Sequence, residues 1–147
     1  MQNVIERKVE IHATKEKIYS TITDSEQLVK WFPETIEGTV AVGEQPIFGF
    51  GEHGKARILV VAANPHEYFS YRWVPGANNH SVADVNTVQT TLVEFKIAES
   101  ADNTCIVTLT ETGFAELPSE MGEAAFGQNS NGWDFMLSRL GKCFAAE

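Results

Sequence analysis

Cysteine is scarce in this sequence and long apolar runs are missing. These two features argue against cysteine-based metal or redox sites and against a membrane-spanning protein. Only Cys105 and Cys143 occur in 147 residues, without the short paired spacing of metal sites and redox centres. We therefore expect two buried, reduced thiols and no metal. No apolar stretch is long enough to span a bilayer, and the first residues lack the apolar core of a signal peptide. These features predict a cytoplasmic protein that does not insert into membranes.

Basic residues are also few. Eleven Lys and Arg stand against 20 Asp and Glu, which gives a formal net charge of -9, and the basic residues form no cluster. Because phosphate backbones and anionic membranes attract positive surface patches, the composition argues against nucleic acid and membranes as partners. The 43% hydrophobic content, with no linker and no internal repeat, predicts a single domain over residues 1–147.

Recognisable catalytic motifs are missing as well. His12, His53, His66 and His80 fall in predicted turns, loops or strand ends, and none is spaced to pair with another metal ligand. The glycine-rich run 49–54 lacks the lysine and the following helix of a phosphate loop and is better explained as a hairpin. No nucleophile elbow occurs. The sequence therefore names no catalytic residue and no cofactor, and a non-enzymatic role is the expectation.

The secondary-structure patterns that are present follow a clear order. Segment 4–11 alternates as a half-buried strand, and Thr14 and Asp24 can each cap a short helix after it. From residue 35 the period changes to two, and turn residues separate six predicted strands, at 35–42, 46–50, 56–63, 67–74, 87–98 and 104–112. Residues 75–86 form a long polar connection, which either overhangs an opening or is disordered.

The strongest helical pattern lies at the carboxy terminus. One helical face carries five large apolar residues, Trp133, Met136, Leu137, Leu140 and Phe144. A broad apolar stripe needs an apolar partner, and a sheet is the one that the chain offers. Weak helix formers between 126 and 132 leave two arrangements open for residues 119–146, a single long helix or a loop followed by a shorter helix.

The first of these arrangements has a further implication. Phe126 and Asn129 would then share the apolar face, while Gly127 and Gly132 would weaken that half of the helix. The helix would combine a firmly packed end with a mobile part, and ligand entry is expected at the mobile part.

Six segments in order carry a family resemblance, namely IHATKEKI (11–18), TDSEQLVKWF (23–32), VG (42–43), YRW (71–73), TLTETGF (108–114) and NGWDFMLSRL (131–140). Together they resemble the SRPBCC (START-like) superfamily, in the branch similar to the carboxy-terminal domain of the heat-shock ATPase activator Aha. The resemblance covers nearly all of the chain. It implies an α+β helix-grip fold, in which a strand, two short helices and six further strands form a curved antiparallel sheet of about seven strands around a long carboxy-terminal helix.

Members of this superfamily bind lipids, hormones or polyketides, and a few cyclise or hydrolyse them. The helix-grip topology would bring side chains from separate elements to the space between sheet and helix. The candidate ligand-binding residues are Trp31, Phe32, Phe48, Arg57, Phe69, Tyr71, Trp73, Phe95, Glu111, Trp133, Met136 and Leu137.

Whether the aromatic residues fill a core or line a pocket stays open at this stage, because large aromatics dominate both. Glu111 and Tyr71 lie among apolar neighbours on their strands, which favours a pocket with a polar end. An ion pair between Arg57 and Glu111 is the alternative, and it would make the charge purely structural.

The sequence is compatible with three functions. The first is binding of a small hydrophobic or aromatic ligand in a cavity between the sheet and the terminal helix. The second, implied by the resemblance, is a protein-interaction module like the chaperone ATPase activator, with a role in the stress response. The third is an enzyme acting on a polyketide-like or aromatic substrate through Glu111 or a histidine. A homodimer through an edge strand or the terminal helix is compatible with all three.

Overall fold

The computed structural model describes residues 3–74 and 84–144, so most of the predicted connection 75–86, with His80, lies outside the described residues. The strands are β1 (Val4–Ile11), β2 (Thr35–Glu37), β3 (Ile47–Gly49), β4 (Lys55–Asn64), β5 (Tyr68–Trp73), β6 (Thr91–Ala101) and β7 (Thr104–Thr112). The α-helices are α1 (Lys15–Thr23), α2 (Ser25–Leu28) and α3 (Ser119–Lys142). Short 3-10 turns occur at Gly51–His53, Val85–Thr87 and Phe114–Glu116.

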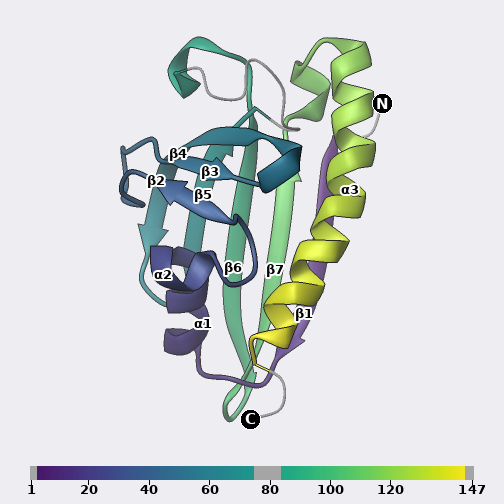
Figure 1. Cartoon of the computed structure of the whole chain (residues 1–147). Coiled ribbons are helices and arrows are strands. Elements are labelled where there is room, and N and C mark those ends of the chain that lie inside the picture. Colours follow the sequence, from purple (N-terminus) through teal and green to yellow (C-terminus); the bar gives the residue numbers. More distant parts are fainter. Residues whose placement is uncertain (1–2, 75–83, 145–147) are drawn as a thin grey trace.

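The seven strands form one curved antiparallel sheet in the order β1-β7-β6-β5-β4-β3-β2. Figure 1 shows the long helix α3 extending beside β1 and β7, with α1 and α2 near one end of β5 and β6. This arrangement is the α+β helix-grip fold, and it confirms the predicted fold class and element order.

Both predicted helix caps are present. Thr14 Oγ1 accepts a hydrogen bond from the backbone N–H of Lys17 at 3.2 Å, and Asp24 Oδ1 accepts one from the backbone N–H of Glu26 at 3.2 Å. Each bond satisfies a backbone donor that the first turn of a helix leaves without a partner. Asp24 is also the C-cap residue of α1, so this one residue ends the first helix and begins the second.

Most strand boundaries agree with the prediction to within three residues, and two differ by more. The first strand after α2 ends at Glu37 rather than at residue 42, because Gly38 adopts a φ of +101° that breaks the extended backbone. Strand β6 begins at Thr91 rather than at residue 87, because Val85–Thr87 forms a 3-10 turn whose cap is the Asp84 carboxylate. Local turn chemistry decides both boundaries.

Residues 119–142 form one continuous helix, which settles the alternative that the sequence left open. Gly127 and Gly132 lower the helix propensity of the middle turns, each by about 1 kcal/mol relative to alanine. Packing of the apolar face offsets this cost, since Trp133 and Leu140 are buried against the sheet. Arg139 and Lys142 in the last turn face the negative end of the helix dipole.

The inward face of β7 contributes an acidic side chain to the core. Residues of this strand alternate strictly, and Val107, Leu109 and Glu111 all have exposures of 0%. Cys105 is buried on the same face, whereas Cys143 after α3 is only partly buried, so the prediction of two buried thiols is right for Cys105 alone. Both are free thiols. The strand alternation therefore places the Glu111 carboxylate inside the space between the sheet and α3.

Candidate functional site

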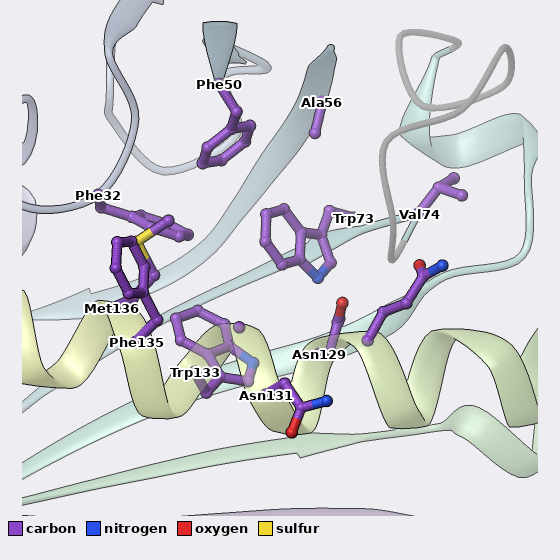
Figure 2. A pocket seen from close by; sticks show the side chains of 12 residues that line it. Phe32, Phe50, Ala56, Trp73, Val74, Asn129, Asn131, Trp133, Phe135 and Met136 are labelled. Carbon is purple, nitrogen blue, oxygen red and sulfur yellow. The ribbon is translucent and has the colours of Figure 1, made fainter. Parts of the chain in front are cut away.

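An apolar pocket with a volume of about 460 Å³ lies between the middle of α3 and the β3–β5 part of the sheet. It is partly open to solvent, and hydrophobic groups make up most of its lining. Its walls are formed by Phe32, Phe50, Ala56, Trp73, Val74, Gln128, Asn129, Asn131, Gly132, Trp133, Phe135 and Met136. Figure 2 shows these side chains, with the amides of Asn129 and Asn131 on α3 and the ring of Phe50 on the opposite side.

Four aromatic rings from different elements form what we call the aromatic floor, namely Phe32, Phe50, Trp73 and Trp133. The ring centroid of Phe32 lies 5.3 Å from that of Trp133 and 5.9 Å from that of Trp73. The two indoles are 6.0 Å apart and tilted by 34°, and Phe50 meets Trp73 edge-on at 6.4 Å. Aromatic pairs at these spacings are mutually attractive, so the floor is a rigid surface rather than a set of loose side chains.

The Glu111 carboxylate lies directly behind this floor and holds it in place. Oε1 accepts hydrogen bonds from the indole N–H of Trp133 at 2.8 Å and from the Asn129 amide at 2.9 Å. Oε2 accepts from the indole N–H of Trp73 at 2.9 Å, the Thr91 hydroxyl at 2.5 Å and the Asn129 amide at 3.1 Å. One carboxylate thus joins β5, β6, β7 and α3.

The hydrogen-bond pattern suits the anionic form of Glu111. Indole N–H and amide NH₂ groups can only donate, and an ionised carboxylate can only accept. Every hydrogen-bond partner of Glu111 among the described residues is electrically neutral, and the ion pair with Arg57 that the sequence offered as an alternative is not formed. Instead, the Arg57 guanidinium donates to the backbone carbonyl of Gln45 at 3.2 Å. It lines a separate polar depression with Asp84.

Tyr71 is the other polar group on the inner face of the sheet. Its ring lies 5.3 Å from that of Trp73, and its hydroxyl is buried without a hydrogen-bond partner among the residues that the structure describes. Burial, and secondarily the negative charge of Glu111, raises the pKa of Tyr71 well above its usual value. This phenol stays neutral across the physiological range.

The structure divides the predicted site residues into three groups. Phe32, Trp73, Trp133 and Met136 line the pocket. The residues packed behind its walls in the core are Trp31, Phe48, Phe69, Tyr71, Phe95, Glu111 and Leu137. Arg57 lies apart from the pocket, at the polar depression. The predicted set therefore combines part of the pocket with the core that supports it.

Eight lining residues were not among the predicted ones, namely Phe50, Ala56, Val74, Gln128, Asn129, Asn131, Gly132 and Phe135. Five of them belong to α3, where positions 128, 132 and 136 follow the i, i+4 spacing of one helical face. That spacing was a usable signal once the helix was known to continue upstream of residue 131. Gln128 and Gly132 carry no large apolar side chain, so the apolar stripe that defined the predicted face did not include them.

No histidine or cysteine of the described residues lines the pocket. His12 is exposed on the surface, where its Nδ1 lies 3.2 Å from the Thr104 hydroxyl, and His66 packs edge-on against Tyr19. Over residues 3–74 and 84–144, no three His, Cys, Asp or Glu side chains are grouped as a metal site would require. In the same part of the chain, no helix is both long and apolar enough to cross a membrane.

Comparison with solved structures shows the same fold in several bacterial proteins. Protein MLL2253 from Mesorhizobium loti matches with a TM-score of 0.76 and 20% identity, over 95% of this chain and 94% of that one. The Aha1 dimer from Colwellia psychrerythraea matches with a TM-score of 0.74 and 23% identity, over 99% and 98% of the two chains. DynU16, a protein in the dynemicin biosynthetic locus, matches with a TM-score of 0.74 and 17% identity, over 97% of this chain and 47% of that one.

At these identities the structural likeness establishes the fold alone. No curated protein matches the chain. The sequence profile of one family, described as "Activator of Hsp90 ATPase homolog 1-like protein", matches residues 12–145. This match confirms the resemblance that the six sequence segments carry. Because it spans most of the chain, the protein belongs to the family of Activator of Hsp90 ATPase homolog 1-like proteins.

Proposed function

We propose that this protein binds a small hydrophobic or aromatic ligand in the pocket between the sheet and α3. The observation that carries the proposal is the aromatic floor, which is open to the pocket on one face and fixed from behind by Glu111. An apolar pocket of about 460 Å³ with a few polar groups at its wall has the size and character of small-molecule sites. The occurrence of one structural relative in a biosynthetic locus is consistent with this role.

The aromatic floor and the polar side chains of α3 make different contacts in the proposed binding. The faces of Trp73 and Trp133 offer stacking area to a planar ligand, and Met136 adds an adaptable apolar contact. The side-chain amides of Gln128 and Asn131 lie on the α3 wall, where they can donate to or accept from a polar edge of the ligand. The Glu111 carboxylate acts behind the floor as a positioning group, since its acceptor sites are used by the protein itself.

The proposal is tested by tryptophan fluorescence and thermal shift with a panel of planar aromatic and lipid-like compounds. A bound ligand should quench or shift the emission of Trp73 and Trp133 and raise the melting temperature by mass action. The matched variants are Gly132→Leu, which places a side chain in the pocket, and Gly127→Leu, which places the same side chain at an exposed position of the same helix. A Cβ atom added at either glycine has no neighbour within 4 Å, so the first atom of the new side chain is accommodated at both positions. Loss of binding only in Gly132→Leu supports the proposal, and equal binding by both variants contradicts it.

A second candidate function is a protein-interaction module. The observation that favours it is Phe135, which is 61% exposed at the pocket rim although it is a large aromatic residue. The structural relative from Colwellia psychrerythraea is a dimer in solution, so a second copy of the chain and a chaperone are the partners to test. Light scattering of wild type and Phe135→Ser tests the first, and retention of a purified Hsp90-type ATPase on the immobilised protein tests the second.

A further inference from the structure

Among residues 3–74 and 84–144, the buried charge at Glu111 has no counter-ion near it. The described groups that hydrogen-bond with it are neutral, and no described Lys, Arg or His lines the pocket. The ion pairs found among the described residues lie at the surface, as Arg7–Asp134, Lys15–Glu99 and Lys55–Glu37. With an exposure of 0%, the carboxylate is also shielded poorly by water or salt. Its negative potential therefore extends into the neighbouring apolar space.

The pocket is the apolar space that this potential reaches first. Trp73 and Trp133 donate to the two carboxylate oxygens and at the same time form part of the pocket floor, so the charge lies at the N–H edge of two rings that a ligand would contact. A hydrogen bond to an anion polarises the donor. The indole rings are thereby made more electron-rich, and indole is the aromatic face that attracts cations most strongly.

The rest of the pocket also offers favourable contacts to a cation. The rings of Phe32 and Phe50 add two further aromatic surfaces, and the amide oxygens of Gln128 and Asn131 can accept hydrogen bonds from an ammonium group. The whole chain carries a formal charge of -9, which attracts cations and repels anions over longer distances.

We propose that this pocket selects its ligand by charge and takes a protonated or quaternary amine joined to an apolar body. The inference rests on the proposed ligand-binding function, because it names the ligand chemistry of the same pocket. The apolar body packs against the aromatic floor, and the cationic head lies over the indole faces in the field of Glu111. Carboxylates and phosphates of the same size are excluded.

The test compares three probes with one benzyl body, which are benzyltrimethylammonium, benzyl alcohol and benzylsulfonate. Their affinities for the full chain are measured by tryptophan fluorescence titration at low ionic strength, with calorimetry as a second readout. We expect the cation to bind at least about tenfold more tightly than the sulfonate. Tighter binding of the sulfonate, or equal binding of all three probes, would overturn the charge selection and leave the proposed pocket function intact.

Variants separate the contribution of Glu111 from that of the pocket shape. Glu111→Gln removes the charge, and in the folded variant the ratio of cation to sulfonate affinity should fall by at least about threefold. Asn131 is exposed on the pocket wall, so Asn131→Asp and Asn131→Lys change the local charge without touching the buried network. The ratio should rise in Asn131→Asp and fall in Asn131→Lys, and an equal ratio in the two variants contradicts selection by charge if Glu111→Gln does not fold.

Two results would contradict the inference. An unchanged ratio in folded Glu111→Gln shows that the buried carboxylate does not select the ligand. Absence of binding by all three probes at millimolar concentration also overturns it, and the neutral aromatic and lipid-like panel then tests the proposed function separately.

Discussion

The indole N–H of Trp133 on α3 donates a hydrogen bond to Oε1 of Glu111 on β7 at 2.8 Å, and this bond connects the terminal helix to the sheet through a buried charge. The other oxygen of the same carboxylate accepts from Trp73 on β5. Both tryptophans line the pocket, so the group that fastens the helix also shapes the proposed ligand surface.

Replacement of this carboxylate should be strongly destabilising. Glu111→Ala leaves the buried donors of Trp73, Trp133, Thr91 and Asn129 without their acceptor, and we expect a loss of about 3–5 kcal/mol in the free energy of unfolding. Urea denaturation measures the loss. The matched control is Glu123→Ala at an exposed position of α3, which should change stability by less than about 0.5 kcal/mol. Similar values for the two variants would show that the network contributes little.

The two buried indoles that donate to different acceptors offer a second test. Trp133 donates to a carboxylate, whereas Trp31 donates to the backbone carbonyl of Thr21 at 2.9 Å. Hydrogen bonds to charged groups contribute about 1.5–3 kcal/mol and those to neutral groups about 0.5–1.5 kcal/mol. Trp133→Phe should therefore destabilise the protein more than Trp31→Phe. Trp133→Ala should cost about 3–5 kcal/mol, since it also leaves a cavity. Equal losses for the two Trp→Phe variants would argue against a charged acceptor.

The raised pKa of Tyr71 leads us to expect that the folded state loses stability at alkaline pH. Its pKa is raised in the folded state by burial first and by Glu111 second, while the unfolded phenol titrates near the ordinary value of about 10. Above that pH the unfolded state binds fewer protons than the folded state, so the stability contributed by the neutral phenol is complete below about pH 10 and is lost as pH rises further. Urea denaturation between pH 8 and pH 11 measures the decline.

Tyr71→Phe should make this alkaline decline shallower. At pH 7 the same variant should change stability by less than about 1 kcal/mol, because the buried hydroxyl has no partner among the described residues. Tyr19→Phe is the matched control, since Tyr19 is only partly buried and should contribute less of the decline. A decline of unchanged slope in Tyr71→Phe would assign the alkaline loss to other groups.

Replacement of two glycines in α3 by alanine should raise the stability of the protein. Gly127 and Gly132 are helical, and a methyl group at either position meets open space, so each change to alanine should stabilise the fold by about 0.5–1 kcal/mol. Gly132 lines the pocket and Gly127 does not. If helix mobility near the pocket controls ligand entry, Gly132→Ala should also slow association in stopped-flow fluorescence, whereas Gly127→Ala should leave it unchanged. Equal association rates would remove the entry role of Gly132.

The sequence alone determined the order of elements, because local signals specify them. Side chains of the residues at the helix caps, Thr14 and Asp24, satisfy their neighbouring donors, and the period-2 pattern of 104–112 defines a strand whatever surrounds it. Six short segments in a fixed order then indicated the family, which the match over residues 12–145 confirms. These features depend on neighbours a few residues apart, which a sequence displays directly.

Tertiary structure alone decided what the inward polar residue does. Alternation places Glu111 on the core face of its strand, but its partners lie 18 to 38 residues away, and one of them, Asn129, belongs to a stretch with low helix propensity. Packing against the sheet keeps that stretch helical, and the helix then carries Asn129 and Trp133 to the carboxylate. The sequence allowed an ion pair with Arg57 as one alternative, because opposite charges attract. The fold instead surrounds the charge with neutral donors and places Arg57 elsewhere.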